Sequence, residues 1–386
     1  MELQTGYPSG SGVEVALAKL AQSYEKAHPN VHLNLVPATA NYQQDLQVRI
    51  AAKNVPDIFD TIGWSKLRYS PFLANLSTQP WNKYVNPQLD SAMRKSSGAI
   101  YALPIDTELS GVIYNKTVLK NAGVDPKTLT TWSAFTNALA KIKASGKAGI
   151  ESSEKADGPA GNFIDWLAPG FYSSAQLASL SKGEFVDGPY TKISDLVSSW
   201  QKAGYFNPDY VSATQDDMGK ALAENTAAFV FNQNFTATTA FVDNPKAQLG
   251  FIPIPNDNGA PYFIGGEDVA FGVSKTSSHK QQAEAFLDYL AKPANDAALA
   301  QAAGAAPGLT NVKADLGGLK DSYETWAVQK QTPIQPYFDR VYLPNGMWNT
   351  LVTTMDSLIT GQGTSSTAVA EASSSFKSLF AKQANQ

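Results

Sequence analysis

Apolar and polar residues follow two different periods along the first part of the chain. Residues 31–36 alternate strictly, as half-buried strands do, and strands are also expected over residues 3–7 and 57–62. Between them, apolar residues recur at helical spacing over 13–27, and a second helix is expected over about 42–53. A strand, a helix and a further strand in succession favour a parallel sheet, so the pattern predicts an α/β fold.

A further apolar strand, over residues 109–114, ends in a turn that begins a helix. Pro104 keeps the residue before it extended, and Glu108 places one carboxylate at the start of the strand. Asn115 is a good N-cap for the helix that follows, and Gly123 is a natural stop in the left-handed conformation. These residue types fit the binding of a polar small molecule better than its chemical transformation.

Composition limits the class of protein. The chain has 386 residues, of which 43% are hydrophobic, so it can bury a large core, and its length favours two domains. Only 17% are charged and the net charge is −4, so no nucleic-acid partner is expected. No apolar window approaches the roughly 18 residues of a membrane span, no signal peptide is recognisable, and cysteine is absent, which excludes disulfides and thiolate chemistry.

Several motifs together resemble one family. They are Pro56-Asp57-Ile58, Ile113-Tyr114-Asn115-Lys116, Thr131-Trp132-Ser133-Ala134-Phe135, the helix and strand over 216–232, and the Gly-Gly strand 265–275 with the helix and Gly304–Pro307 after it. The chain is similar to the extracellular solute-binding proteins of ATP-binding cassette (ABC) importers, family 1, the carbohydrate-binding proteins like maltose-binding protein. It departs from the family pattern at Pro126, which stands five residues before Thr131, and at Asn225, where glycine is usual.

The resemblance implies a fold and a function. The fold would be α/β, with two doubly wound α/β lobes joined by a multi-strand hinge, as in periplasmic-binding-protein type II folds. The N-terminal lobe would combine residues 1–112 with 266–310, and the C-terminal lobe 113–265 with 311–386, with the ligand cleft between them. A ligand that contacts both lobes only in the closed state would drive closure.

The protein would then be a receptor subunit that captures a sugar, from a monosaccharide to a short oligosaccharide. It would deliver the sugar to the transmembrane subunits of an ABC permease, as a monomer without a cofactor. The resemblance also implies an exported protein, either a cell-surface lipoprotein or a periplasmic protein, whose signal was trimmed and replaced by Met1.

A sugar site needs aromatic platforms for C–H faces and planar polar groups for hydroxyls. The aromatic candidates are Trp64 after the third strand, Trp348 at a helix start, Phe235 after the 226–232 strand, and Tyr7 after the first strand. The polar candidates are Glu108, Glu267, Asp268, Asn41, Gln44 and Asn234, with Gly266 leaving room for close approach to the backbone.

Alternatives remain open for these residues. The resemblance gives Glu108 the role of holding a sugar hydroxyl and Trp348 that of a platform. The alternatives are a surface or hinge salt bridge for Glu108 and core packing for Trp348. Trp64 could also be a packing residue. Only one of Glu267 and Asp268 is expected in the cleft, without a choice between them. Trp166 and Tyr172 are better explained by core packing than by ligand binding.

Motifs for chemistry are absent from the sequence. The histidines, His28, His32 and His279, lack partners at metal-binding spacing and are interpreted as surface residues, so neither a metal site nor a catalytic residue is predicted. A carbohydrate-active enzyme would need opposed carboxylates, but neighbours on a strand such as Glu267 and Asp268 point to opposite faces. A receptor for a polyamine or a polyol phosphate remains a further alternative.

Overall fold

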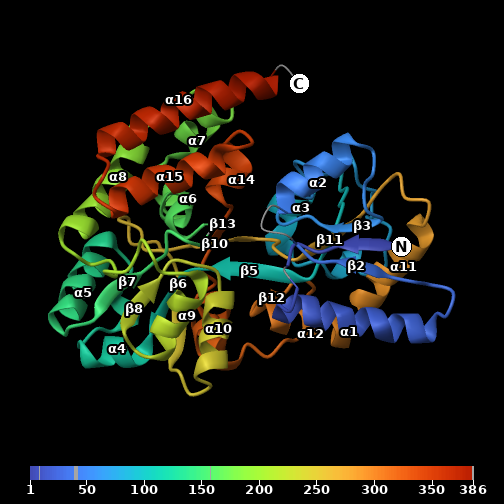
Figure 1. Ribbon diagram of the computed structural model, residues 1–386, viewed down its shortest axis with the longest axis horizontal. Coiled ribbons are helices and arrows are strands. Elements are labelled where there is room, and N and C mark those ends of the chain that lie inside the picture. The colour runs from blue at the N-terminus through green and yellow to red at the C-terminus, as the bar shows by residue number, and fades with distance from the viewer. Residues whose placement is uncertain (8, 39–41, 157, 385–386) are drawn as a thin grey trace. The chain divides into compact units, whose positions relative to one another are not determined.

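The computed structural model describes residues 1–7, 9–38, 42–156 and 158–384 of the chain (Figure 1). By its internal contacts the chain divides into two compact parts. Unit 1 comprises Met1–Leu109 and Gly265–Leu316, and unit 2 comprises Ser110–Ile264 and Gly317–Gln386. Each unit has a sheet and helices of its own, and each is described separately.

Unit 1 contains a five-stranded sheet in the order β2-β1-β3-β11-β4. The bounds of its elements are β1 Glu2–Gln4, α1 Gly12–Ala27, β2 Asn34–Val36, α2 Tyr42–Ala51, β3 Ile58–Asp60, α3 Asp90–Met93, β4 Leu103–Pro104, β11 Ala270–Val273, α11 Lys280–Leu290, α12 Pro293–Ala303 and β12 Ala306–Pro307. β1 runs parallel to β2 and β3, as the sequence pattern predicts, whereas β11 runs antiparallel to β3 and β4.

Strand β3 shows how the sheet of unit 1 acquires two apolar faces. Ile58 packs in the cluster that contains the buried residues of α1, α11 and α12. The next residue, Phe59, packs instead with Tyr42 and Leu46 of α2. Neighbouring residues of a strand point to opposite faces, so helices cover both sides of this sheet, and Figure 1 shows α1 and α2 on opposite sides of its strands.

The first strand is shorter than the sequence pattern predicts. β1 ends at Gln4, and the predicted strand continued to Tyr7. The hydroxyl of Thr5 accepts a hydrogen bond from the Tyr7 N–H at 3.1 Å, a local bond that turns the chain out of the strand direction. The predicted helix over 13–27 is confirmed by α1, which Ser11 caps by accepting a hydrogen bond from the Glu14 N–H.

Unit 2 contains a four-stranded sheet in the order β7-β8-β6-β9. Its main elements are β6 Val112–Asn115, α4 Lys116–Asn121, α5 Trp132–Ala144, β7 Ala148–Glu151, α6 Pro159–Phe171, α7 Ser174–Leu180, α8 Asp187–Lys202, α9 Gln215–Ala223, β8 Ala227–Val230, α10 Phe235–Asp243, β9 Leu249–Ile252, α13 Lys320–Tyr323, a π-helix Glu324–Gln329, β13 Ile334–Gln335, α14 Phe338–Tyr342, α15 Met347–Ile359 and α16 Ser365–Ala384. β7 and β8 are parallel, whereas β6 is antiparallel to both β8 and β9.

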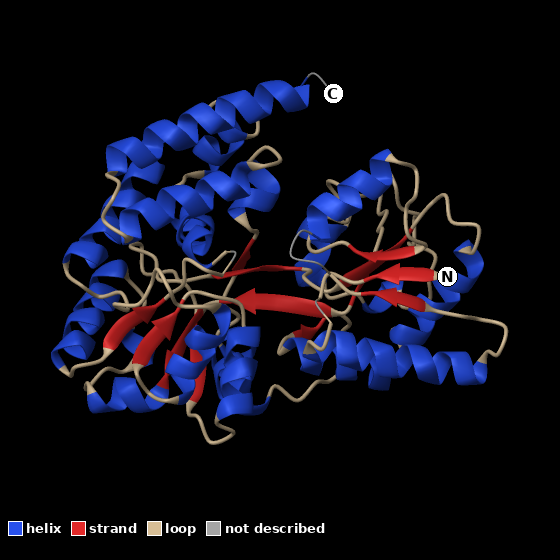
Figure 2. Cartoon of the chain, viewed as in Figure 1, coloured by secondary structure: helices blue, strands red, loops and turns tan. Residues whose placement is uncertain are grey.

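Aromatic side chains form much of the core of unit 2. The ring of Phe135 in α5 lies 4.7 Å from Phe229 of β8 and 5.7 Å from Trp200 of α8, measured between ring centroids. These three residues are fully buried. Helices α6, α8, α15 and α16 pack against one another beside this core, and Figure 2 shows them as a group of helices apart from the strands.

The chain passes between the units inside strands. β5 (Asp106–Ser110) and β10 (Phe263–Gly266) each contain a unit boundary, and they are neighbours in a third sheet of order β12-β5-β10-β13. The sequence predicted one strand over 109–114, which is wrong, because Gly111 separates β5 from β6. Residues 265–275 likewise form two strands, β10 and β11, with a break at 267–269.

The helix caps and the helix stop predicted from the sequence are confirmed residue by residue. The Asn115 side chain accepts a hydrogen bond from the Val118 N–H at 2.9 Å and so caps α4, and Gly123 has φ +65°. Thr131 caps α5 by accepting from the Ala134 N–H at 3.2 Å. Asn225 has φ +58°, in the left-handed region. It therefore supplies the conformation for which the family pattern uses glycine.

Gly111 gives a test of the break between β5 and β6. A Cβ atom there would collide with the carbonyl oxygen of Ile252 and lie 2.9 Å from Phe263 Cε1. We expect Gly111→Ala to lower the free energy of unfolding of unit 2 by about 1–3 kcal/mol, as overpacking does. Chemical denaturation measures this change. Gly188→Ala in α8 is the control, since a Cβ there meets no atom within 4 Å; equal losses in both variants would contradict the explanation.

Candidate functional site

Tyr7 and Asp268 of unit 1 contact each other beyond the ends of β1 and β10. The Tyr7 hydroxyl donates to Asp268 Oδ2 at 2.8 Å, and both side chains are partly exposed. The neighbouring Glu267 is fully buried, and its Oε1 accepts a hydrogen bond from the Ser65 N–H at 3.1 Å. The two adjacent carboxylates therefore have different partners, and Asp268 is the one that solvent reaches.

Two buried carboxyl groups hold the segment that carries Asp268. Asp106 Oδ1 accepts hydrogen bonds from the backbone N–H groups of Asp268 and Val269, both at 3.0 Å. Asp60 Oδ1 accepts from the N–H of Ala270 at 3.2 Å and from that of Ile62 at 3.1 Å. Neither residue was predicted from the sequence, because neither stands in a motif and each accepts hydrogen bonds from a segment far along the chain.

The carboxyl groups of this cluster interact with one another. Burial, and then the charge of Asp268, raise the pKa of Asp60 to about 8. Burial, followed by Asp268 and Glu108, raises the pKa of Asp106 well above its usual value. Burial and the carboxylates of Asp268, Asp106 and Asp60 also raise the pKa of Tyr7. A raised pKa favours the protonated form, and a protonated carboxyl can both donate and accept hydrogen bonds.

Glu108 lies inside β5 and not before it. Its side chain is 4% exposed, and its charge contributes to the raised pKa of Asp106. A simple surface salt bridge, one of the alternatives from sequence, does not describe such a buried residue. Its role toward a sugar stays a prediction.

Trp64 is packed into the apolar cluster of unit 1 that lies under α2. Its side chain is 5% exposed, among neighbours that include Phe59 and Tyr69. The guanidinium carbon of Arg68 lies 3.8 Å from the ring centroid, so one face of the indole is already covered. Gln44 is exposed on α2, and Asn41 lies outside the described residues. The binding roles of all three stay predictions.

Trp348 of unit 2 lies against the first turn of α6. The residue is partly exposed at the second position of α15. A Cβ atom on Gly161 would lie 3.0 Å from Trp348 Cη2, and one on Gly158 would lie 3.4 Å from its Cζ2. Glycine at these positions gives the indole room to lie on the helix, and the residue as a whole is partly exposed.

Phe235 and Asn234 follow β8 and begin α10. Phe235 is 38% exposed, which is unusual for an aromatic residue, whereas Asn234 is only 7% exposed. Beside them Asn232 donates from Nδ2 to Gln215 Oε1 at 3.2 Å and to Thr236 Oγ1 at 3.0 Å. Amide and hydroxyl groups thus gather at the end of β8 around one exposed ring.

A carboxyl pair that the sequence analysis did not single out lies on α6 and α14. Asp165 is fully buried, and its Oδ1 accepts a hydrogen bond from the Asp339 N–H at 2.6 Å. Burial, and then the charge of Asp339, raise the pKa of Asp165 to about 7. A lone aspartate inside an otherwise apolar helix was the available signal. Trp166 and Tyr172 nearby are 0% and 4% exposed, so core packing is confirmed for them.

The acidic side chains of the described residues do not gather in the arrangements that a metal site or a pair of facing carboxylates needs. The described residues contain no group of three or more acidic, histidine or cysteine side chains that could hold a metal ion. Glu267 and Asp268 have different hydrogen-bond partners and do not form a facing acid and nucleophile. In the same part of the chain, no helix combines the length and apolar character that crossing a membrane requires.

Comparison with known proteins identifies the family. The sequence pattern described as bacterial extracellular solute-binding protein matches residues 19–329. The chain belongs to this family. It is 33% identical over 352 residues to the melibiose/raffinose/stachyose-binding protein MelE of Bacillus subtilis, covering 87% of this chain and 79% of that protein. The resemblance inferred from sequence is therefore confirmed, and the family consists of binding proteins and not enzymes.

Solved structures of the family have the same fold. The binding protein MsmE of Bacillus subtilis is 29% identical, with a TM-score of 0.90 over 100% of this chain and 99% of that chain. A sugar transporter from Bacillus licheniformis, in complex with stachyose, is 27% identical, with a TM-score of 0.88 over 98% of this chain and 100% of that one. The predicted α/β fold of periplasmic-binding-protein type II is confirmed.

The buried carboxyls predict how stability depends on pH. Raised pKa values mean that the folded protein binds more protons than the unfolded chain between about pH 4 and 8, so stability is greatest at the acidic end of this range and falls toward pH 8. Asp296 in α12 is fully buried, and burial alone raises its pKa to about 8. We expect the melting temperature to fall between pH 5.5 and 8.5, and Asp296→Asn to reduce that fall.

Thermal melts at five pH values would measure this dependence. Asp257→Asn is the matched control, because Asp257 is exposed and its substitution should leave the profile unchanged. A wild-type melting temperature that rises across this range would show that the buried carboxyls are ionised in the folded state.

Proposed function

We propose that the sugar bound by this ABC importer receptor is melibiose, raffinose or stachyose. The similarity to the Bacillus subtilis protein named for these three sugars carries the proposal. The Bacillus licheniformis structure with stachyose, whose whole length this chain covers, supports it. All three sugars share a terminal galactosyl unit, so one recognition site at the galactosyl end would serve the series.

The electrostatics of unit 1 favour a neutral sugar over a phosphorylated polyol. Asp60, Asp106, Glu108 and Asp268 lie close enough to one another for their charges to interact. The carboxyls of this cluster that keep their negative charge would repel a phosphate group, whereas sugar hydroxyls can donate to carboxylates and accept from protonated carboxyls. A polyamine would be attracted to the same carboxylates, so the choice of a sugar depends on the similarity to the protein named for melibiose, raffinose and stachyose.

Each unit would supply part of the recognition. In unit 1 the candidates are Tyr7, Glu108 and Asp268, with Asp268 preferred to Glu267 because it is partly exposed. In unit 2 they are Trp348 and Phe235, whose exposed ring surface could cover sugar C–H faces. We further propose that one sugar contacts both units and draws them together. The transmembrane subunits of a permease would recognise that state, and a lipid anchor would hold the receptor at the cell surface.

A ligand panel tests the sugar class. Raffinose, stachyose and melibiose should raise the melting temperature, because a ligand at 100 times its dissociation constant stabilises by about 2.7 kcal/mol. Maltose and sn-glycerol 3-phosphate at equal concentration should give a much smaller shift. Differential scanning calorimetry with each ligand measures this. A shift with sn-glycerol 3-phosphate alone would replace the proposed function with polyol-phosphate binding.

Two substitutions test the site residues. Trp348→Ala removes a platform and Asp268→Asn removes a charged acceptor, and each should weaken raffinose binding at least tenfold, or about 1.4 kcal/mol, in isothermal titration calorimetry. Phe72→Ala is the control for the loss of a partly exposed aromatic ring. Phe72 is 37% exposed, and its carbonyl accepts a hydrogen bond from the Lys275 N–H, which follows β11, whereas Asp268 precedes that strand. If Phe72→Ala weakens binding as much, these assignments are wrong.

A further inference from the structure

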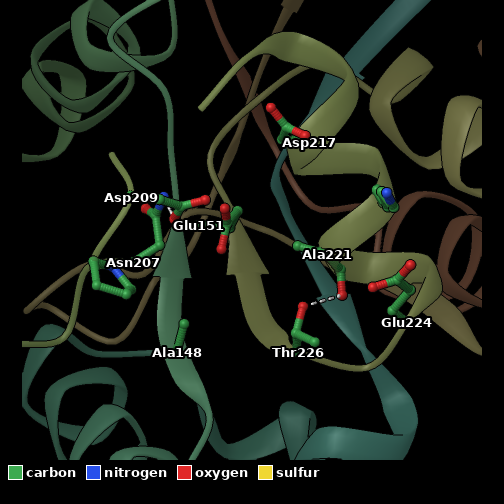
Figure 3. A pocket seen from close by; sticks show the side chains of 10 residues that line it. Ala148, Glu151, Asn207, Asp209, Asp217, Ala221, Glu224 and Thr226 are labelled. Atoms are coloured by element: carbon green, nitrogen blue, oxygen red, sulfur yellow. Dashed lines mark hydrogen bonds between the residues drawn. The ribbon is translucent and has the colours of Figure 1, made fainter. Parts of the chain in front are cut away.

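Unit 2 contains a pocket that the sugar-site candidates do not line. Its volume is about 430 Å³, within the range of small-molecule sites. The walls are residues of β7, the segment that follows Phe206, and the outer face of α9 (Figure 3). The lining residues are Ala148, Glu151, Asn207, Pro208, Asp209, Asp217, Lys220, Ala221, Glu224 and Thr226.

The lining is strongly acidic. Four of its residues carry carboxylates, Glu151, Asp209, Asp217 and Glu224, against the single ammonium of Lys220. Two of the carboxylates are already engaged. Asp217 Oδ2 accepts from the N–H and the hydroxyl of Thr214, each at 2.8 Å, and Asp209 Oδ1 accepts from Asn207 Nδ2 at 2.9 Å.

Glu151 differs from the other three. It ends β7, it is 5% exposed, and no described residue donates a hydrogen bond to its carboxylate. Figure 3 shows it in the middle of the lining, between Asp209 and α9. Burying a carboxylate without a donor is unfavourable. Burial, and then the charges of Asp209 and Asp217, raise the pKa of Glu151 to about 8. The Glu151 carboxylate thus lines the pocket without a hydrogen-bond donor from the described residues.

We propose that this pocket binds a short aliphatic diamine in its doubly protonated form. One ammonium group would donate to the Glu151 carboxylate, and the second would lie among the rim carboxylates of Asp209, Asp217 and Glu224. The described residues contain no cluster of ligands suited to a metal ion, whereas an ammonium needs only acceptors at hydrogen-bond distance. The pocket is also larger than a bare ion requires. The inference is independent of the proposed sugar.

The sign of the pH dependence follows from the same geometry. A diamine stays protonated up to about pH 10, the range of ordinary alkylammonium groups. Glu151 must lose its proton to bind the cation, so binding releases a proton at neutral pH. Affinity should therefore rise between pH 6.5 and 8.5. The other charged groups of the lining are Asp209, Asp217, Lys220 and Glu224, and the charges of Asp209 and Asp217 act on Glu151.

Isothermal titration calorimetry of the full chain with 1,4-diaminobutane tests the proposal. We expect saturable binding that strengthens from pH 6.5 to 8.5 and that 1,4-butanediol, the uncharged analogue, does not reproduce. Glu151→Gln should weaken binding at least tenfold and remove the pH dependence, while raffinose binding stays unchanged. Asp209→Asn should weaken it severalfold, which keeps the test decisive if Glu151→Gln fails to fold.

Glu154→Gln is the matched control, because Glu154 is exposed, three residues further along, and outside the lining. Its affinity for the diamine should equal that of the wild type. Absence of saturable binding, equal binding of the diol, or full affinity in Glu151→Gln would each overturn the proposal. Tight binding of Mg²⁺ or Ca²⁺ that Glu151→Gln abolishes, without any diamine binding, would overturn it in favour of a metal site.

Discussion

Three successive backbone N–H groups, at residues 268–270, depend on buried carboxyls for their hydrogen bonds. Asp106 accepts hydrogen bonds from the first two of these groups, and Asp60 accepts one from the third. Residues 268 and 269 lie between β10 and β11, and residue 270 begins β11. A buried N–H left without a partner is costly, and the two carboxyls supply the acceptors. The position of Asp268, and with it the hydroxyl of Tyr7, follows from this arrangement. The unit 1 part of the candidate site thus depends on the hydrogen bonds that these backbone N–H groups donate to Asp106 and Asp60.

Local patterns in the sequence predicted much of the fold. The cap at Asn115 and the stop at Gly123 depend on residues within a few positions of each other, so short-range rules recover them. The breaks between strands were missed, because Gly111 separates β5 from β6 only through its close approach to Ile252 in another strand. The alternation of residues along a strand continues across Gly111, and nothing in it indicates the contact with Ile252.

The candidate site was predicted less completely, for a related reason. Trp348 and Phe235 stand out by residue type, and the structure leaves part of each exposed. Trp64 has the same residue type and stands at a strand end, but Arg68 covers one face of its ring. Asp60 and Asp106 accept hydrogen bonds from backbone N–H groups that lie more than 150 positions away in the sequence. Residue type suggests which side chains could bind, whereas long-range contacts decide which of them are accessible.

The division of both units along the sequence bears on the order of folding. Unit 1 needs residues 265–316 to complete its sheet, since β11 lies between β3 and β4. A chain synthesised from its N-terminus therefore contains most of unit 2 before unit 1 has all of its strands. Contacts between segments so far apart form slowly, and the incomplete intermediates expose apolar surface. The same discontinuity would keep the nascent chain unfolded for longer, in the extended state that passage across a membrane demands.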